Sequence, residues 1–388
     1  MKKILLETLT CAVVCTCLAT SCSKSSNSSG NSGTSGTSGS APTVSAITPA
    51  NGPDSTIVTI TGTGFSATAA DDNVSFNGKQ ATVTSASSTQ LQAMVPTLAG
   101  TGNVKITVNS QTVTGPSFTY DTTYRVSTYA ENLNVPQYLA IDGSGDLFVS
   151  VLGYNEVYEI TPGGSITPFN GFPGPSGVVA DNSGHIYVAA NTNINTVGYY
   201  KGFGAGGVAA IGTGTGFVDG LVLDANNNLY AANTEGSEID KITPQGTLTV
   251  FASNIPNVGG LALGADGSLY ATTTPATYSL TAGSVVKFSP SGTMTTVATG
   301  LQFNGRDGLA VDGSNNLYMT CYTTESPTSY VIEVKAAGTG TVSAANNIVL
   351  TTNVLIPRGI TIDQTGNLYV VNVGTNVDGG SISKLTMH

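Results

Sequence analysis

An internal repeat fills most of the chain after residue 120 and limits the folds that this chain can adopt. Each copy holds two apolar runs joined by a turn rich in Asp, Gly and Asn, which is typical of a β-hairpin. Two further short runs follow a hairpin, and consecutive copies begin about 40 to 50 residues apart. Four strands at this spacing are typical of a β-propeller blade. The hairpins occupy residues 138–150, 177–189, 220–232, 260–272, 308–320 and 359–371.

The last copy is incomplete, and this predicts how the ring closes. It ends after its third strand, SISKLTMH, and has no fourth. YRVSTYA, residues 124–130, is a strand-like run that precedes the first copy and belongs to none. Pairing of residues 124–130 with residues 381–386 would complete six blades and remove an exposed sheet edge. We therefore predict a six-bladed propeller over residues 121–388.

The composition excludes several classes of protein. Only 9% of the 388 residues are charged and 48 are Gly, which disfavours a helical or coiled-coil protein. The net charge of -10 leaves no basic surface to neutralise phosphates, so nucleic acid is excluded as a partner. His is the usual general base near neutral pH. Catalysis by His would depend on His185 or His388, the two histidines of the chain.

The N-terminal 40 residues have the features of an export signal and a tether. Residues 1–22 combine two Lys with an apolar stretch of signal-peptide length. The stretch closes with LATSC, which resembles the bacterial lipobox, and this resemblance makes Cys22 the lipidated residue. Residues 23–40 are rich in Ser and Gly, which is typical of a flexible linker. We expect a lipid-anchored protein of the bacterial cell envelope, at the outer membrane.

Residues 41–120 alternate apolar and polar positions over short runs, which predicts a small β-sandwich. Ile47, Pro49 and Gly52, then GTGF at 62–65 and VSFNGKQA at 74–81, resemble the IPT/TIG family of immunoglobulin-like domains. That family implies a spacer or interaction module of a bacterial surface protein. The adjacent acidic residues Asp71 and Asp72 are expected in a solvated turn.

Four of the five cysteines lie in residues 1–22, so Cys321 remains as a free thiol and no disulfide framework is possible in the folded part. Cys321 follows apolar residues of a predicted strand, and we expect it to be buried and inert.

The repeats are similar to NHL-type blades and, more loosely, to the SMP-30/gluconolactonase group of six-bladed propellers. These resemblances imply the fold, whereas propellers of different functions share it.

A candidate site follows from the residues that precede the innermost strands, because these strands begin at one face of such propellers, around the channel mouth. Asp219 and Asp307 offer oxygen ligands for Ca²⁺ or another divalent metal. In the gluconolactonase-like group an Asp in this context helps to hold a metal that polarises the lactone carbonyl. That group also uses a Glu before the first inner strand, which NVPQYLAID lacks. The six positions are Gln137, Ser176, Asp219, Gly259, Asp307 and Arg358.

Other residues of this face are further candidates. Asn191 and Asn233 lie at the ends of second strands, and Tyr322 and Arg358 lie on the rim, where they offer hydrogen bonds and an aromatic ring to a ligand. The alternative for Asp219 and Asp307 is a structural role, in which the carboxylates accept hydrogen bonds from backbone amides.

Four recurring or suggestive features are assigned to structure. Asp142, Asp181, Asp224, Asp312 and Asp363 recur before the hairpin turn and are expected to cap it at the opposite face, with Gly264 in the fourth copy. Phe or Tyr recurs once per copy, which indicates packing between blades. GFGAGG, residues 202–207, lies between strands with no helix to bind a phosphate, so no dinucleotide site is expected. His185 is expected to be a polar surface residue of a turn.

These observations favour a non-catalytic envelope protein whose propeller binds an extracellular polysaccharide or protein, with no cofactor. The alternative is a metal-dependent lactone hydrolase that uses Asp219 and Asp307. The partners expected are the ligand and, through the lipid anchor, the membrane.

Overall fold

The computed structural model describes residues 41–181, 183–190, 196–201, 209–213, 217–276, 282–302, 307–322, 329–334, 342–343, 348–375 and 379–388. The predicted signal, the linker, Cys22 and Asn191 lie outside these residues, as does the GFGAGG segment. The described residues form strands and two short 3-10 turns, Ala69–Asp71 and Leu152–Tyr154, and include no α-helix. No helix long and apolar enough to cross a membrane occurs among them.

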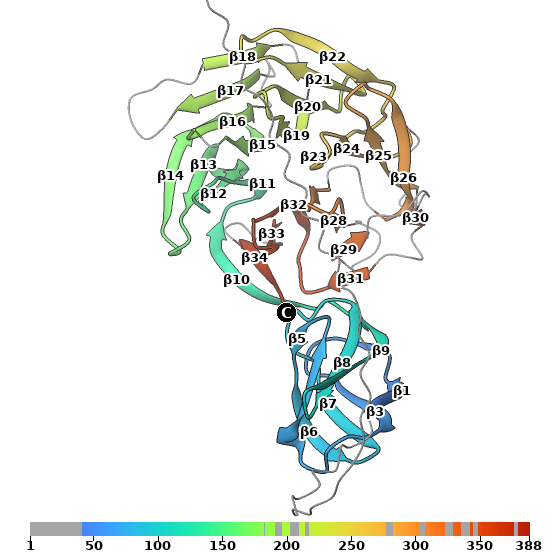
Figure 1. Cartoon of the computed structure of the whole chain (residues 1–388). Coiled ribbons are helices and arrows are strands. Elements are labelled where there is room, and N and C mark those ends of the chain that lie inside the picture. The colour runs from blue at the N-terminus through green and yellow to red at the C-terminus, as the bar shows by residue number, and fades with distance from the viewer. Residues whose placement is uncertain are drawn as a thin grey trace, which may run out of the picture. The chain divides into compact units, whose positions relative to one another are not determined.

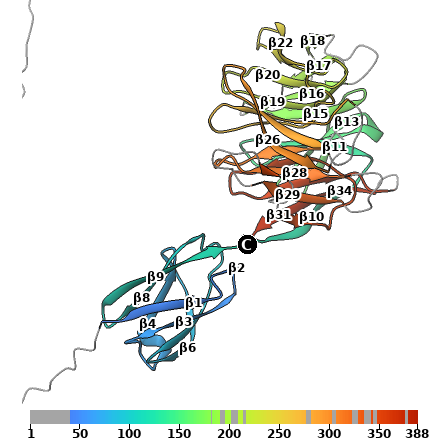
Figure 2. The ribbon, with the colours of Figure 1, turned by 90° about the vertical axis from the view of Figure 1, so that its right-hand side faces the viewer.

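The first nine strands form two sheets of an immunoglobulin-like sandwich, as predicted (Figure 2). Alternate side chains of both sheets are buried, because successive residues of a strand point to opposite faces. Phe76 and Phe118 meet in this core with their ring centroids 5.1 Å apart, in an edge-on arrangement. One sheet has the order β1 (Thr43–Thr48), β3 (Ile57–Thr63), β7 (Gln90–Met94), β6 (Thr82–Ser87); the other has the order β2 (Asn51–Gly52), β9 (Gln111–Tyr120), β8 (Gly102–Val108), β4 (Asp72–Phe76), β5 (Lys79–Gln80).

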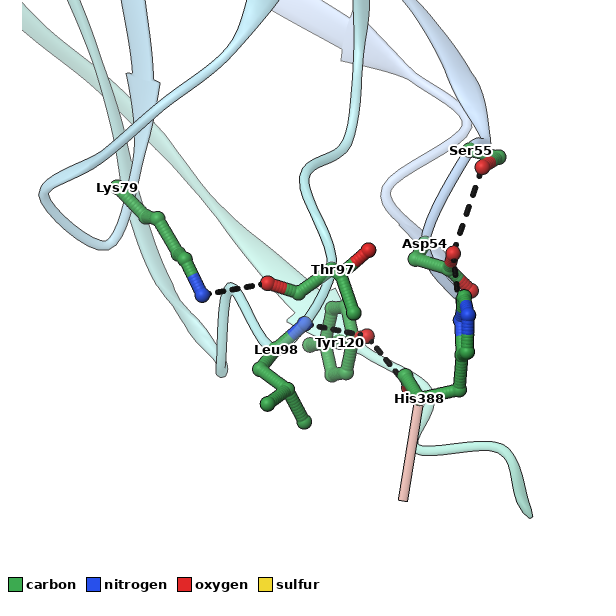
Figure 3. Close-up of polar contacts among 7 residues, drawn as sticks. All are labelled: Asp54, Ser55, Lys79, Thr97, Leu98, Tyr120 and His388. Atoms are coloured by element: carbon green, nitrogen blue, oxygen red, sulfur yellow. Dashed lines mark hydrogen bonds and ion pairs between the residues drawn. The ribbon is translucent and has the colours of Figure 1, made fainter. Parts of the chain in front are cut away.

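Tyr120, the last residue of β9, connects three segments (Figure 3). Its hydroxyl accepts a hydrogen bond from Leu98 N at 2.9 Å and donates one to His388 O at 2.7 Å. His388 Nδ1 lies 2.8 Å from Asp54 Oδ2. Lys79 Nζ donates to Thr97 O in the same region.

The expectation of a solvated turn is wrong for Asp72. Its side chain is buried, and its Oδ1 accepts a hydrogen bond from Ser66 N at 3.0 Å. Burial raises the pKa of this carboxyl, against the lowering effect of the hydrogen bond from Ser66. Asp72 therefore holds the segment before β4 in place, whereas Asp71 stays exposed, as expected of a turn.

The remaining strands form six antiparallel sheets around a ring, which are the six predicted blades (Figure 1). Blade 1 is β11 (Pro136–Ile141), β12 (Leu147–Val151), β13 (Glu156–Ile160), β14 (Ile166–Gly171); blade 2 is β15 (Pro175–Ala180), β16 (His185–Ala190), β17 (Thr196–Lys201), β18 (Ala209–Thr213); blade 3 is β19 (Val218–Leu223), β20 (Leu229–Asn233), β21 (Glu238–Ile242), β22 (Leu248–Ser253). Blade 4 is β23 (Leu261–Leu263), β24 (Leu269–Thr273), β25 (Gly283–Phe288), β26 (Met294–Leu301); blade 5 is β27 (Leu309–Val311), β28 (Leu317–Cys321), β29 (Tyr330–Val334), β31 (Ile348–Thr351); blade 6 is β32 (Pro357–Ile362), β33 (Leu368–Asn372), β34 (Gly380–Met387), β10 (Tyr124–Leu133).

Blade 4 carries one strand more than predicted. Val342–Ser343 (β30), which lies between β29 and β31 in the sequence, pairs in parallel with the outer strand β26. A segment that connects two strands of blade 5 therefore covers the outer edge of blade 4 at Ala298 and Thr299.

The predicted closure pairing is present in the structure. β10 pairs antiparallel with β34, with Arg125 opposite Thr386 and Ala130 opposite Ile382. The first strand of the ring is thus the outer strand of the last blade.

Glycines at the start of the inner strands allow neighbouring blades to pack backbone against backbone. A Cβ atom added to Gly308 of blade 5 would lie 2.5 Å from Arg358 O of blade 6, and one added to Gly260 of blade 4 would lie 2.5 Å from Asp307 O. Gly359 of blade 6 has the same relation to the backbone of blade 1, so that the close approach continues across the closure. The equivalent residue of blade 1 is Tyr138, which packs instead into the core shared with blade 2.

The hairpin turns are capped as predicted. In each of the five copies with an Asp, Oδ1 accepts hydrogen bonds from the backbone N–H groups two and four residues later. In three of these copies the Asn at the fourth position donates its Nδ2 to Oδ2 of the Asp at 2.7 Å. Where the fourth copy has Gly264, Asp266 accepts from Ser268 N and pairs with Lys287.

His185 takes the place of that Asn in blade 2. Its Nδ1 lies 2.6 Å from Asp181 Oδ2, and its side chain is 21% exposed, so it is less of a surface residue than expected. The aromatic column, by contrast, packs into the cores between blades as predicted.

Candidate functional site

We call the six residues that were predicted around the channel mouth the mouth residues: Gln137, Ser176, Asp219, Gly259, Asp307 and Arg358. Four of them lie at an irregularity of the inner strands. In β11 the register passes from Pro136 opposite Val151 to Leu139 opposite Val149, so one extra residue is inserted, and β15, β19 and β32 do the same. A bulge of this kind turns a side chain out of the regular alternation. Gln137, Ser176, Asp219 and Arg358 fall within these bulges, whereas Gly259 and Asp307 lie two residues before their shorter inner strands begin.

Asp219 is a buried carboxylate of blade 3, with 2% of its surface exposed. Its Oδ2 lies 3.1 Å from Thr234 Oγ1, which in turn lies 2.9 Å from Val258 O in the segment that leads to blade 4. Burial of an ionisable group is favourable only with such partners. Asp219 therefore helps to fix the end of the second strand of its own blade.

Asp307 is the corresponding carboxylate of blade 5 and is 1% exposed. Its Oδ1 accepts a hydrogen bond from the backbone N–H of Tyr322 at 3.2 Å. Burial raises the pKa of the Cys321 thiol well above its ordinary value, and the charge of Asp307 adds to this effect. Burial, with Cys321 and Asp307, also raises the pKa of Tyr330 to about 12. The thiol is thus buried and protonated, as expected of an inert cysteine.

The structure brings some of the candidate residues together and places others apart. Tyr322 contacts Asp307 through its backbone, and Arg358 accepts hydrogen bonds from Gly308 N and Thr320 Oγ1 on its carbonyl oxygen. Asp219 and Asp307 belong to blades 3 and 5, which blade 4 separates. Gln137 donates its Nε2 to the carbonyl oxygens of Val135 and Pro136.

Asn233 is engaged by acidic residues that sequence reasoning missed. Its Nδ2 lies 3.1 Å from Asp240 Oδ2 and 3.2 Å from Glu238 Oε1, and its Oδ1 accepts from Gly236 N. Burial raises the pKa of Asp240 to about 6, against the lowering effect of Asn233. A comparison of the repeats could have found this position. The strand registers make Asp240 of blade 3 equivalent to Ser383 of blade 6, so blade 3 has a carboxyl group where blade 6 has a hydroxyl group.

Below the mouth, aliphatic side chains of the inner strands line the channel. A cavity of about 190 Å³ is lined by the inner strands. Its lining includes, from every blade, the residue two positions after the mouth residue, which is Leu139, Val178, Leu221, Leu261, Leu309 or Ile360. Aliphatic residues from all six blades thus line the cavity close to the mouth residues.

The described mouth residues do not fit the metal site that the gluconolactonase resemblance implies. No three His, Cys, Asp or Glu side chains in the described part of the chain lie close enough together to hold a metal ion. The amide oxygen of Asn233 is occupied by Gly236 N, and Gln137 stands where that group has a Glu. We derive no catalytic step through a metal.

Comparisons with known proteins support the two-part fold. The IPT/TIG domain family model matches residues 42–120. No curated protein matches the sequence significantly. Among solved structures, a protein of unknown function from Bacteroides thetaiotaomicron has a TM-score of 0.53 at 16% identity, over 90% of this chain and 99% of that one.

Two further solved structures differ in how much of the chain they cover. An auxiliary nutrient binding protein from Bacteroides ovatus has a TM-score of 0.51 at 15% identity, over 90% of this chain and 98% of that one. A gluconolactonase from Xanthomonas campestris has a TM-score of 0.53 at 14% identity, over 68% of this chain and 90% of that one. At these identities the likeness establishes the fold alone.

Proposed function

We propose that the chain is a lipid-anchored protein of the bacterial cell envelope whose propeller binds an extracellular ligand, a polysaccharide or a protein, without chemical conversion. One observation carries this proposal. The likeness to the auxiliary nutrient binding protein extends over 90% of this chain, so it must include both the sandwich and the propeller. The likeness to the gluconolactonase extends over 68% of this chain.

The channel mouth is the candidate ligand site. Its two carboxylates are buried and hydrogen-bonded within their own blades, so they are held in fixed positions. Tyr322 and Arg358 are half-buried, which leaves part of each side chain accessible. A site built from fixed polar groups with an accessible aromatic ring favours recognition.

The second candidate function is lactone hydrolysis with Asp219 and Asp307 as metal ligands. It is favoured by the likeness of the propeller to the gluconolactonase and by the burial of both carboxylates.

A single set of measurements separates the two functions. The protein, treated with a chelator, is titrated with Ca²⁺, Mn²⁺ and Zn²⁺ while its thermal unfolding is followed, and its hydrolysis of gluconolactone is assayed. A metal at 100 times its dissociation constant would add about 2.7 kcal/mol to the free energy of unfolding. A metal-dependent shift and hydrolysis that Asp219→Asn and Asp307→Asn both abolish would refute the binding proposal. The exposed Asp71→Asn is the control.

The anchor is tested separately in a bacterial host. Cys22→Ser should move the protein from the membrane fraction to the soluble fraction and abolish labelling with a radioactive fatty acid. Retention of the label would refute the assignment of Cys22. The neighbouring Ser21→Ala is the control.

A further inference from the structure

A pocket of about 420 Å³ lies between the hairpin turns of blades 3 and 4. Asp224, Lys241 and Phe251 of blade 3 form one side, and Leu263, Ala265 and Pro290 of blade 4 form the other. The turns follow the inner strands and therefore lie at the end of the blades away from the mouth. None of the mouth residues lines this pocket.

Phe251 reaches the pocket because the outer strand of blade 3 has a bulge. The register passes from Ile239 opposite Ala252 to Asp240 opposite Val250, so Phe251 has no partner residue and turns toward its own blade. Its ring packs edge-on against Tyr230, with centroids 5.1 Å apart, and against Phe288 of blade 4, at 5.8 Å. The side chain is half-buried, which leaves part of it to the pocket.

The polar groups of the pocket are balanced in charge. Lys241 Nζ lies 5.2 Å from the centroid of the Tyr230 ring. Burial raises the pKa of Asp224, but hydrogen bonds from Asn228 and Asn226 outweigh burial and hold the pKa below its ordinary value. One ammonium and one carboxylate thus line the pocket, together with an exposed amide, Asn226.

This combination differs from that of the central channel. The channel cavity is smaller and is lined by aliphatic side chains, glycines, Tyr138 and Thr361. The pocket between the turns combines apolar walls with groups that donate and accept hydrogen bonds, and its volume falls in the range of about 300 to 1,000 Å³ that is typical of small-molecule sites.

We propose that this pocket binds one neutral saccharide unit. The C–H face of a sugar ring would contact the apolar walls at Phe251, Leu263 and Pro290, and its hydroxyl groups would accept from the ammonium of Lys241 and bond with the amide of Asn226. A charged ligand gains little net attraction, because the opposite charges of Asp224 and Lys241 both line the pocket. This inference rests on the proposed function in taking the extracellular ligand to be a glycan.

The test uses substitutions at the pocket with matched substitutions elsewhere in the ring. Ala265→Trp fills the pocket from an exposed turn position, and Gln364→Trp introduces the same residue at the equivalent exposed position of blade 6. Lys241→Gln removes the ammonium, and Lys384→Gln removes the equivalent one, whose Nζ lies 5.1 Å from the centroid of Tyr369. None of these positions belongs to the buried core.

Binding of the methyl glycosides of glucose, galactose, mannose and N-acetylglucosamine is measured by calorimetry and by saturation-transfer NMR. We expect at least one glycoside to bind, Ala265→Trp to abolish its binding, and Lys241→Gln to weaken it at least tenfold. Gln364→Trp and Lys384→Gln should change the affinity by less than twofold. Equal effects of the pocket variants and their controls would refute the inference.

Two other outcomes separate the inference from the proposed function. Saccharide binding that Tyr322→Ala abolishes and Ala265→Trp leaves intact would overturn the pocket assignment and leave the proposed function standing. Binding of a partner protein without binding of any glycoside would also overturn the pocket assignment alone.

Discussion

Replacing Gly308 with Ala tests the closest contact between blades. Gly308 lies against the backbone of blade 6, and a Cβ there would be 2.5 Å from Arg358 O and 2.6 Å from Ile360 N. Both obstacles are backbone atoms, so no side-chain rotation removes the clash. The two inner strands must separate by about 0.5 Å to reach 3.0 Å, below which real Cβ atoms are essentially never found.

The expected cost is large because the ring is closed. Overpacking typically costs about 1 to 3 kcal/mol, and a movement of one inner strand is transmitted to its neighbours, so we expect about 3 kcal/mol. For a domain of this size that corresponds to a decrease in melting temperature of about 6 to 12 °C.

Differential scanning calorimetry measures the effect, since the chain has no Trp for fluorescence. Gly313→Ala is the matched control, because an added Cβ there meets no atom within 4 Å and the residue lies in the turn of the same blade. A Gly308→Ala protein that melts within 1 °C of both Gly313→Ala and the wild type would refute the argument that the inner strands touch backbone to backbone.

Three further predictions concern the caps, the buried carboxyl and the closure. Asp312→Ala removes the acceptor of two backbone N–H groups and should lower the free energy of unfolding by about 1 to 3 kcal/mol, as measured by urea denaturation; no loss would contradict the capping role. The pKa of Asp240 is raised to about 6, so its ionisation disfavours the folded state increasingly as the pH rises from about 4 to 6. Asp240→Asn should therefore raise the melting temperature at pH 8 more than at pH 4, and an equal change at both would contradict the raised pKa. Cys residues at Ser127 and Lys384, which face each other across the closure, should form a disulfide that adds about 4 kcal/mol relative to the reduced protein, and failure to oxidise would contradict the pairing.

The sequence predicts those parts of the fold that local patterns determine. The hairpins are recognisable because each turn carries its own cap, as Asp224 and Asp312 show. The closure is predicted by counting strands. The last copy lacks its outer strand, the first strand belongs to no copy, and their pairing removes an exposed sheet edge.

The mouth is less predictable, because the partners of its residues come from elsewhere in the chain. Thr234 contacts Asp219, and Tyr322 contacts Asp307, at a separation of 15 residues in the sequence in each case. No local sequence pattern predicts either contact. The bulge of the outer strand has a weak signal, two adjacent apolar residues at Val250 and Phe251. The pattern does not reveal which of them faces inward, and the structure exposes Val250 at 55%.

The pairing of β10 with β34 also orders the assembly of the ring in time. The antiparallel strands of blades 1, 2, 3 and 4 follow one another in the sequence, and in blade 5 only β30 intervenes between β29 and β31, so each of these sheets can form from a short stretch of chain. Blade 6 requires Ser127 to meet Lys384, a contact that spans 257 positions. Contacts of long sequence separation form slowly, because the chain between them must be confined first. We therefore expect the ring to stay open until β34 pairs with β10. During refolding, the amides of blade 5 should become protected from hydrogen exchange before those of blade 6.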